Sequence, residues 1–334
     1  MRLATYNVEW FTTLFDDQNR LQMDDAWSQR YNVTRAQQGA ALGCVFQRLD
    51  ADAVLVVEAP DTNKKRDTVA ALEGFAAHFG LRARAAVMGF VNETQQEIAL
   101  LYDPDALTAR HAPRDGTKTV PRFDGVFDVD LDVDATRDHV RFSKPPLELD
   151  VETVAGTAFH IIGAHLKSKA PHGARTAADV AKLAVANRRK QLAQAVWVRA
   201  RIDQLLAEKR GVMVMGDLND GPGLDEFEGR FGRSSVEVVM DGAAGALFDP
   251  HARRALTARL GAAPTSARFW MKDDKRYLQA LLDYIMVTPD LQARAAVWRI
   301  WHPLDDPECW SDAQLRAALV TASDHFPVSI DLDI

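Results

Sequence analysis

The sequence predicts an α/β protein, a four-layer α/β sandwich in which two packed, mixed β-sheets are flanked by helices. Three observations predict this fold class. Short apolar runs typical of strands recur along the chain, helical segments lie irregularly between them, and no repeat, low-complexity tract or Ser/Gly/Pro-rich linker divides the 334 residues. We therefore expect a single domain over 1–334, large enough to bury an extensive core.

The first third of the chain alternates strands and helices. Thr34 and Gln37 have the spacing of a capping box, which predicts the start of a helix there. Gly80 is well placed to end a second helix. The expected elements are the strand Leu3–Tyr6, the helix Thr34–Leu49, the doubly buried strand Val54–Val57 and the helix Arg66–Phe79.

The middle of the chain has the pattern of antiparallel strands. Ala155-Gly156-Thr157 lies between two apolar runs and predicts a hairpin. The expected strands are Ile98–Tyr102, Phe127–Val133, Leu147–Val154 and Ala158–Ala164.

The last part is expected to begin with one long helix. It covers Arg175–Glu208, which is rich in Ala, Arg, Lys and Gln. Four more strands are expected, at Val212–Met215, Ala280–Val287, Ala293–Ile300 and Phe326–Ile334.

Composition limits the classes of function. The net charge of −7 repels polyanions, so phosphate or nucleic acid would need a local basic patch or a bound cation. Cys44 and Cys309 lie in no metal-binding pattern and are expected to be free thiols in a reducing compartment. The chain begins directly with a strand-like segment and has no run as long as a membrane span, so we predict a soluble, cytoplasmic protein. No obligate protein partner is expected.

Polar residues follow the expected strands with one recurring pattern. An apolar run delivers an acidic, amide or imidazole side chain at its end, and strand ends are rigid mounts on which such groups can converge. The segments are Leu3–Asn7, Val54–Glu58, Ile161–His165, Val212–Asn219 and Leu281–Asp283, with Ser323–His325 just before the last strand.

Three of these residues suit a hard metal ion. Asn7, Glu58 and Asp324 offer the oxygen atoms that Mg²⁺ or Mn²⁺ prefers. His165 and His325 can donate to a phosphate oxygen or move a proton near neutral pH. Together these groups supply what hydrolysis of a phosphoester requires: charge neutralisation, an oriented water and in-line geometry.

Each residue taken alone also has an ordinary structural explanation. A carboxylate after a strand is most often a loop residue or a helix cap, and Asp217 to Gly221 would make an acceptable turn. Six strand-end sites with the residue types of one chemistry are hard to obtain from turns alone. The combination therefore predicts a metal-dependent phosphoesterase.

The same segments resemble those of the endonuclease/exonuclease/phosphatase superfamily, in the same order along the chain. The most specific are Gly216-Asp217-Leu218-Asn219-Asp220 and Ser323-Asp324-His325-Phe326-Pro327-Val328, and the others are Thr5–Val8, Val57-Glu58, Ala164–Lys169 and Leu282–Ile285. The resemblance implies a four-layer α/β sandwich and dependence on a divalent metal, Mg²⁺ or Mn²⁺.

The resemblance also implies roles for individual residues. Glu58 becomes the principal metal ligand, with Asn7 and Asp324 nearby. Asp217 orients or deprotonates the attacking water, and Asn219 holds a phosphate oxygen. One departure is Ala59-Pro60 after Glu58, which could reshape the loop beside the metal.

The histidines receive partners in the same way. Asp283 is expected to pair with His325 and fix its tautomer. His165 matches the second histidine of the deoxyribonuclease and sphingomyelinase branches, where its acidic partner falls near Glu97.

The substrate is predicted from the residues after His165. Lys167 and Lys169 could contact a phosphodiester backbone, whereas Arg188 to Lys190 are better explained as a solvated helix face. We predict first a nuclease-like phosphodiesterase, second a phosphatase or diesterase for a small phosphorylated metabolite, and third an inactive binding protein. The net charge of −7 favours the second, and the intact set of site residues argues against the third.

Two aromatic segments have no assigned role. Trp301 and Trp310 lie in a Pro-bounded loop that is better explained as a buried anchor than as a base-stacking wall. Phe269-Trp270 precedes the Asp283 segment and could reach the site.

Overall fold

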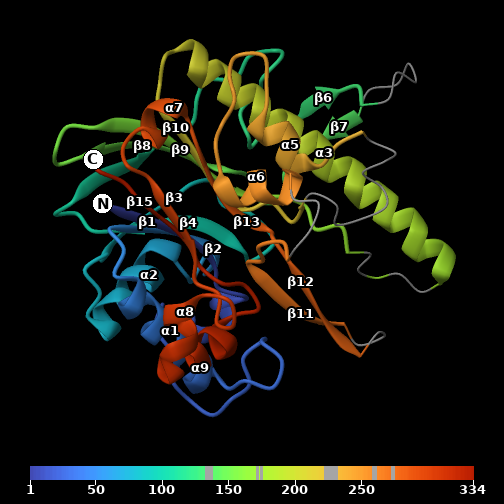
Figure 1. Cartoon of the computed structure of the whole chain (residues 1–334). Helices are drawn as coiled ribbons and strands as arrows, with labels where there is room; N and C mark the ends of the chain where they lie inside the picture. Colours follow the sequence, from blue (N-terminus) through green and yellow to red (C-terminus); the bar gives the residue numbers. More distant parts are fainter. Residues whose placement is uncertain (132–137, 171–172, 174–175, 222–231, 258–261, 272–274) are drawn as a thin grey trace.

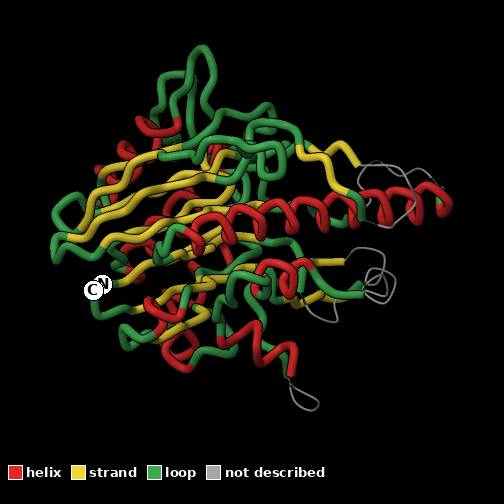
Figure 2. The backbone as a smooth tube through the Cα atoms, turned by 90° about the horizontal axis from the view of Figure 1, so that it is seen from above, coloured by secondary structure: helices red, strands yellow, loops and turns green. Residues whose placement is uncertain are grey.

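Two β-sheets pack face to face, and helices cover the outer face of each (Figures 1 and 2). The structure is a computed structural model that describes residues 1–131, 138–170, 173, 176–221, 232–257, 262–271 and 275–334. The arrangement confirms the predicted four-layer α/β sandwich. None of the helices among these residues combines the length and apolarity that a membrane span needs.

The first sheet has six strands in the order β14-β15-β1-β2-β4-β3, of which β1 and β2 are parallel. Its outer face packs against α1, α2, α8 and α9 through a cluster that includes Val45, Phe75 and Leu319. The strands are β1 (Arg2–Asn7), β2 (Ala53–Ala59), β3 (Ala85–Met88), β4 (Glu97–Tyr102), β14 (Val297–Ile300) and β15 (Val328–Asp331). The helices are α1 (Arg35–Leu49), α2 (Thr68–Phe79), α8 (Pro307–Ser311) and α9 (Ala313–Ala322), with a 3₁₀ turn at Phe11–Leu14.

The second sheet has five strands in the order β13-β10-β9-β8-β5, of which β9 and β10 are parallel. Its outer face packs against α3, α5 and α6, where Trp197, Ile202 and Val236 are buried. The strands are β5 (Leu107–His111), β8 (Leu147–Thr153), β9 (Ala158–His165), β10 (Val212–Asp217) and β13 (Asp283–Val287). The helices are α3 (Ala177–Ala207), α5 (Ser235–Met240), α6 (Pro250–Thr257) and the short α7 (Pro289–Gln292).

Strand β2 shows how the alternation of side chains builds the layers. Leu55 and Val57 belong to the apolar cluster between the sheets, whereas Val54 and Val56 belong to the cluster under the helices. Both faces of the strand are therefore buried, as the continuous apolar run predicted.

The helix boundaries follow local capping chemistry. The predicted capping box of Thr34 and Gln37 is present, and Gly80 ends α2 with a φ of 63°. Helix α2 begins later than predicted because Asp67, not Arg66, caps it by accepting from the backbone N–H of Ala70. Helix α3 is capped by Thr176 and Asp179; Arg175 lies outside the described residues.

Several predicted strands are shorter, and two small hairpins stand apart from the main sheets. The segment expected at Ala280–Val287 is divided, because Ala280 ends β12 and the chain passes through Leu281 and Leu282 before β13 begins. The predicted strand Phe127–Val133 is described only as far as 131. The hairpins are β6 (Phe127–Val129) with β7 (Asp138–Val140), and β11 (Ala267–Met271) with β12 (Arg276–Ala280).

Candidate active site

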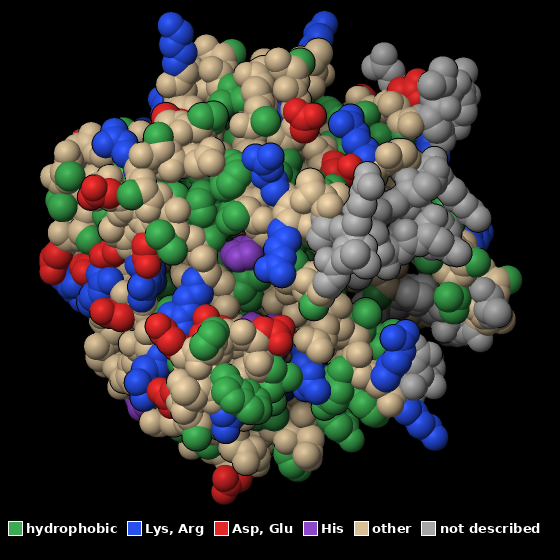
Figure 3. All heavy atoms as spheres, viewed as in Figure 1, with side chains coloured by type: hydrophobic (Ala, Val, Ile, Leu, Met, Phe, Trp, Pro, Cys, Tyr) green, Lys and Arg blue, Asp and Glu red, His purple; other side chains and the backbone are tan. Residues whose placement is uncertain are grey.

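A cavity of about 840 Å³ opens at the edge where β1, β2, β9 and β10 end. Strand β15 runs antiparallel to β1, and β13 runs antiparallel to β10, so the residues that precede or begin them reach the same edge. Figure 3 shows a histidine surface beside Lys or Arg side chains near the centre of the face viewed in Figure 1. The predicted site residues that line the cavity are Asn7, Glu58, His165, Lys167, Lys169, Asp217, Asn219, Asp324 and His325.

Glu58 reaches the cavity because β2 contains a β-bulge. Val57 pairs with Ile98 and Ala59 pairs with Glu97, so Glu58 is an extra residue with no partner in β4. Its φ is 62°, in the left-handed region that is uncommon for glutamate. The bulge turns the carboxylate toward the site, where Oε2 accepts from the backbone N–H of Trp10 at 2.9 Å.

The three predicted metal ligands lie along one wall. The amide of Asn7 donates to Oδ2 of Asp217 at 3.1 Å and to Oε1 of Glu58 at 3.5 Å. The backbone N–H of Asp324 donates to Oε2 of Glu9 at 2.9 Å. Burial and the nearby carboxylates of Glu9 and Glu58 raise the pKa of Asp324 to about 7 despite the charge of His325.

Asp217 lies at the centre of the site. Its Oδ1 accepts from the backbone N–H of Asn219 at 2.7 Å, and its Oδ2 lies 3.6 Å from Nε2 of His165 and 3.9 Å from Nε2 of His325. Burial raises the pKa of Asp217 to about 7, and the neighbouring charge of Asp283 acts in the same direction. A carboxyl group with this pKa can accept a proton at neutral pH.

Asn219 holds Asp217 in place. Its side-chain amide donates to Oδ2 of Asp217 and to the carbonyl of Leu166, both at 3.1 Å. Both N–H groups are thus used inside the protein, which differs from the predicted contact with a phosphate oxygen. The backbone of Asn219 has a φ of 51°, in the left-handed region that asparagine tolerates.

Asp283 and His325 form the predicted pair. Oδ2 of Asp283 lies 2.8 Å from Nδ1 of His325 and also accepts from the hydroxyl of Ser266 at 2.8 Å. Burial opposes a charge on His325, but the carboxylates of Asp283 and Asp217 hold its pKa well above the usual value. His325 is therefore an imidazolium that points Nε2 toward Asp217.

His165 has a different partner from the one predicted. Its Nε2 lies 3.0 Å from Nζ of Lys144, and its buried Nδ1 has no hydrogen-bond partner among the described residues. The carboxylate of Glu97 instead accepts from the backbone and side-chain N–H groups of Asn92, so the expected pair of His165 and Glu97 is not formed. Burial and then Lys144 hold the pKa of His165 well below its usual value, which leaves the ring neutral.

Lys144 was not identified from the sequence. Burial lowers the pKa of its ammonium to about 8, although Glu58 and Asp217 favour the charged form, and Nζ also donates to Oε1 of Gln96 at 3.0 Å. The signal that could have found it is Pro145-Pro146, which ends the loop just before β8. Because β8 runs antiparallel to β9, this loop lies at the edge where His165 ends its strand.

The two predicted substrate lysines have different environments. Lys167 has its side chain at the cavity, with no carboxylate partner among the described residues. The ammonium of Lys169 donates to Oδ1 of Asp220 at 2.7 Å. Lys169 is thus bound within the protein, and Arg188, expected on a solvated helix face, is fully buried against the same carboxylate.

The carboxylates of the cavity are suited to a cation. Asp217, Asp283 and His325 offer three ligand atoms within 4.8 Å of one another, and Oδ1 of Asp283 has no hydrogen-bond partner among the described residues. Nδ1 of His325 is already paired with Asp283, so the oxygen donors Asn7, Glu58 and Asp324 fit Mg²⁺ or Mn²⁺ better. Burial is the main cause of the raised pKa values of Asp217 and Asp324, and the neighbouring carboxylates of Asp283, Glu9 and Glu58 act in the same direction.

An apolar wall faces the polar one. Phe269, Met271 and Leu278 of the β11–β12 hairpin line the cavity, and the ring of Phe269 lies 5.4 Å from that of His325. Trp301 is buried and donates to the hydroxyl of Ser329, as expected for a loop anchor, whereas Trp310 is exposed. Phe269 thus reaches the site, and Trp301 does not line it.

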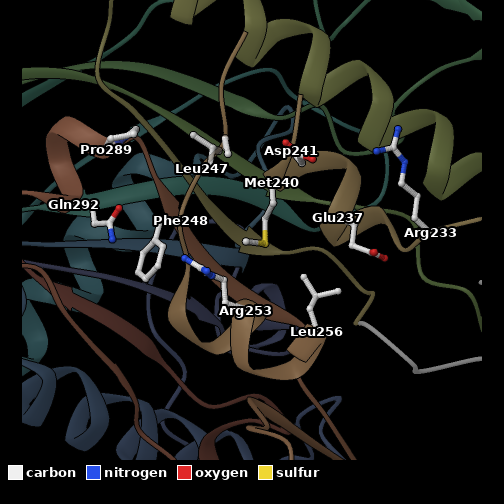
Figure 4. A pocket seen from close by; sticks show the side chains of 11 residues that line it. Arg233, Glu237, Met240, Asp241, Leu247, Phe248, Arg253, Leu256, Pro289 and Gln292 are labelled. Atoms are coloured by element: carbon white, nitrogen blue, oxygen red, sulfur yellow. The ribbon is translucent and has the colours of Figure 1, made fainter. Parts of the chain in front are cut away.

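A separate cavity of about 610 Å³ lies beside α5, α6 and α7 (Figure 4). Its wall includes Met240, Leu247, Phe248 and Arg253, and none of the predicted site residues lines it. The chemistry-bearing side chains are concentrated in the other cavity.

The comparisons with known proteins agree with this fold. A two-sheet sandwich with a polar cavity at its strand ends is the arrangement that the sequence predicted for a phosphoesterase. The sequence matches the Endonuclease/Exonuclease/phosphatase family over residues 4–325, and the chain belongs to that family. No curated protein matches the sequence.

Solved structures of the same fold cover the whole chain. An AP endonuclease from Archaeoglobus fulgidus is 12% identical with a TM-score of 0.52, and the match covers 100% of both chains. TDP2 from Caenorhabditis elegans is 12% identical with a TM-score of 0.51, covering 99% of this chain and 73% of that one. A mannosyl-6-phosphatase from Bacteroides thetaiotaomicron is 14% identical with a TM-score of 0.51, covering 99% of both chains. At these identities the likeness shows the fold alone.

Proposed function

We propose that this phosphoesterase is a divalent-metal-dependent phosphodiesterase that cleaves nucleic acid by attack of an activated water. The observation that carries the proposal is the composition of one cavity. A carboxyl group with a pKa near 7, Asp217, lies between two histidines, and the lysines Lys144 and Lys167 line the same cavity. Carboxylates to hold a metal and activate water are thus combined with cations to hold a phosphate.

Asn7, Glu58 and Asp324 would hold Mg²⁺ or Mn²⁺ at this wall. A bound divalent cation neutralises the charge of the phosphate oxygens and orients the phosphate. The bulge at Glu58 and the hydrogen bond from Asn7 to Glu58 keep these donors together before anything binds.

The other residues perform the proton and charge chemistry. Asp217, oriented by Asn219 and Asn7, accepts the proton of the attacking water. The imidazolium of His325, oriented by Asp283, stabilises the negative charge that develops on the phosphate oxygens. His165 stays neutral, and its Nε2 accepts from the ammonium of Lys144, which is thereby held in place to bind a second phosphate oxygen.

A small phosphorylated metabolite is the second candidate substrate. The net charge of −7 favours it, and so does the pairing of Lys169 and Arg188 with Asp220, which removes two cations from the basic run expected after His165. Against it, Lys167 lies at the cavity without a carboxylate partner among the described residues, in a position to meet a phosphate that flanks the scissile one.

A substrate screen with purified protein and Mg²⁺ or Mn²⁺ separates the candidates. It compares bis(p-nitrophenyl) phosphate, p-nitrophenyl phosphate, single- and double-stranded DNA, RNA and inositol phosphates. We expect hydrolysis of the diester and of polynucleotides, and loss of both in excess chelator. Hydrolysis confined to monoesters would instead establish the metabolite phosphatase.

A further inference from the structure

Arg141 and Lys190, outside the active site, are among the cations that have no carboxylate partner within the described part of the chain. Most arginines of this acidic protein are paired; Arg82, Arg84, Arg114 and Arg299, for example, each contact an aspartate. Among the described residues, the side chains of Arg141 and Lys190 contact no acidic group. Two such cations on one groove would attract an anion there, even on a protein of net charge −7.

Arg141 and Lys190 line one groove. It has a volume of about 530 Å³ and lies between β7 and α3. The other charged groups along it are already neutralised: Arg189 contacts Asp138 at 2.9 Å, and His139 lies 2.6 Å from Asp128. As far as the structure describes the chain, the groove therefore presents two cations without an acidic partner, on walls whose other charged groups are paired.

Two chain segments connect this groove to the active site. On one side, Arg141 is followed by Ser143 and Lys144, which line the active-site cavity. Three residues of extended chain span at most about 10 Å, so the two cavities adjoin on this side.

The second connection runs along α3. The backbone of Lys167 accepts from the side chain of Gln191 at 2.9 Å and donates to that of Gln194 at 2.8 Å. Lys190 immediately precedes Gln191, so its side chain starts next to Lys167. Their proximity is also seen in the pKa of Lys167, which burial and then the charge of Lys190 lower.

We propose that a polynucleotide strand bound at the active site continues into the groove between β7 and α3, where Arg141 and Lys190 hold its flanking phosphates. This inference rests on the proposed nuclease function and extends it with a defined path. Lys144 and Lys167 contact the strand near the scissile phosphate, and Arg141 and Lys190 contact it about three nucleotides further along, given a rise of about 3.4 Å per nucleotide. These contacts position the strand and carry no sequence preference.

The test compares a 12-nucleotide single-stranded DNA with a dinucleotide. The double variant Arg141→Ala with Lys190→Ala removes both free cations. The matched control, Arg110→Ala with Lys209→Ala, also removes two exposed cations, at the opposite end of the second sheet. Binding is measured by fluorescence anisotropy in chelator over a salt series, and kcat/KM is measured with Mg²⁺.

We expect the double variant to bind the 12-mer about tenfold more weakly and to lower its salt slope by about 1.4, or roughly 0.7 for each phosphate contact on a single strand. The dinucleotide and the control variant should show no change, and Arg141→Lys with Lys190→Arg should restore the slope. If the wild type cleaves the 12-mer and the double variant behaves as the control does, the proposed path is wrong while the nuclease function stands. If the wild type hydrolyses only small monoesters, the nuclease function itself is wrong, and the path with it.

Discussion

Strand β9 carries two buried histidines, His160 and His165, in opposite electrostatic surroundings. At His160, Nδ1 lies 3.0 Å from Asp150, and that carboxylate also contacts Arg110, Arg114 and Arg210. Burial opposes the charge on Asp150, but His160 and Arg114 lower its pKa, so this cluster is balanced. Five residues further along the strand, at His165, the pKa values of Asp217 and Lys144 are both displaced toward neutrality, to about 7 and about 8.

The pKa values of the groups around each histidine thus distinguish a structural cluster from a candidate functional one, although both clusters are buried and contain histidine. At His160, three arginines surround the carboxylate of Asp150, although the buried Nε2 of His160 has no hydrogen-bond partner among the described residues. The cluster at His165 keeps charged groups close together without satisfying them, which costs stability and is typical of a site that awaits a ligand. Variants of both clusters can test this distinction.

The largest effect is expected from Glu58. Glu58→Gln removes one charge from the proposed metal site without disturbing the core, and the loss of several kcal/mol of charge stabilisation corresponds to about a thousandfold in kcat. Activity of the variant should be measured on bis(p-nitrophenyl) phosphate over a series of Mg²⁺ concentrations. Full activity at low Mg²⁺, or wild-type activity in excess chelator, would refute the metal assignment.

The two histidines can be compared directly. His165→Ala should lower kcat by roughly 100- to 10,000-fold, the range for loss of an acid–base or phosphate contact. His160→Ala should leave kcat within about twofold and instead lower the free energy of unfolding by roughly 1 to 3 kcal/mol. Steady-state kinetics and urea unfolding of both variants test this, and equal kinetic effects would remove the distinction between the clusters.

Lys144 should act through its charge. Its pKa of about 8 predicts that activity declines as the pH rises through that value, because the ammonium loses its proton. Lys144→Gln should reduce kcat/KM by about tenfold to a hundredfold. Lys144→Arg should keep part of the activity and abolish the alkaline decline, since arginine does not titrate there. An unchanged decline in the arginine variant would assign it to another group.

The smallest effect concerns stability in acid. Burial lowers the pKa of His160 to about 4, so between pH 6.5 and pH 4 the unfolded chain binds a proton that the folded chain does not. Stability therefore falls as the pH drops through this window, and His160→Gln should remove about 1 to 3 kcal/mol of that fall. Urea unfolding at pH 7 and pH 5 measures the difference, and a parallel loss in both proteins would contradict it.

The sequence allowed the layers and most of the site to be predicted because both depend on local patterns. Alternating and continuous apolar runs located most strands of the two sheets, and the residues at their ends converge as expected. The pairing of Asp283 with His325 was predicted from the resemblance. The strand that carries Asp283 is shorter than predicted, because Leu281 and Leu282 lie outside β13.

What the sequence did not show depends on contacts between distant segments. Lys144 reaches His165 only because β8 pairs with β9, and Glu97 is diverted to Asn92 within its own loop. Lys169 and Arg188 converge on Asp220 from separate elements. Small hairpins such as β11–β12 have too few residues for a clear periodicity, so only Phe269 of the apolar wall was anticipated, and Met271 and Leu278 were not.

The backbone strain at the Glu58 bulge lowers the stability of this protein. Glutamate with a φ of 62° is held in a conformation that costs about 1 kcal/mol or more, and glycine would adopt it freely. Glu9, Trp10 and Asn219, which also line the cavity, have positive φ as well. Selection of variants for thermal stability alone should therefore enrich substitutions at these positions first. The selected variants would be more stable but would lose catalytic activity.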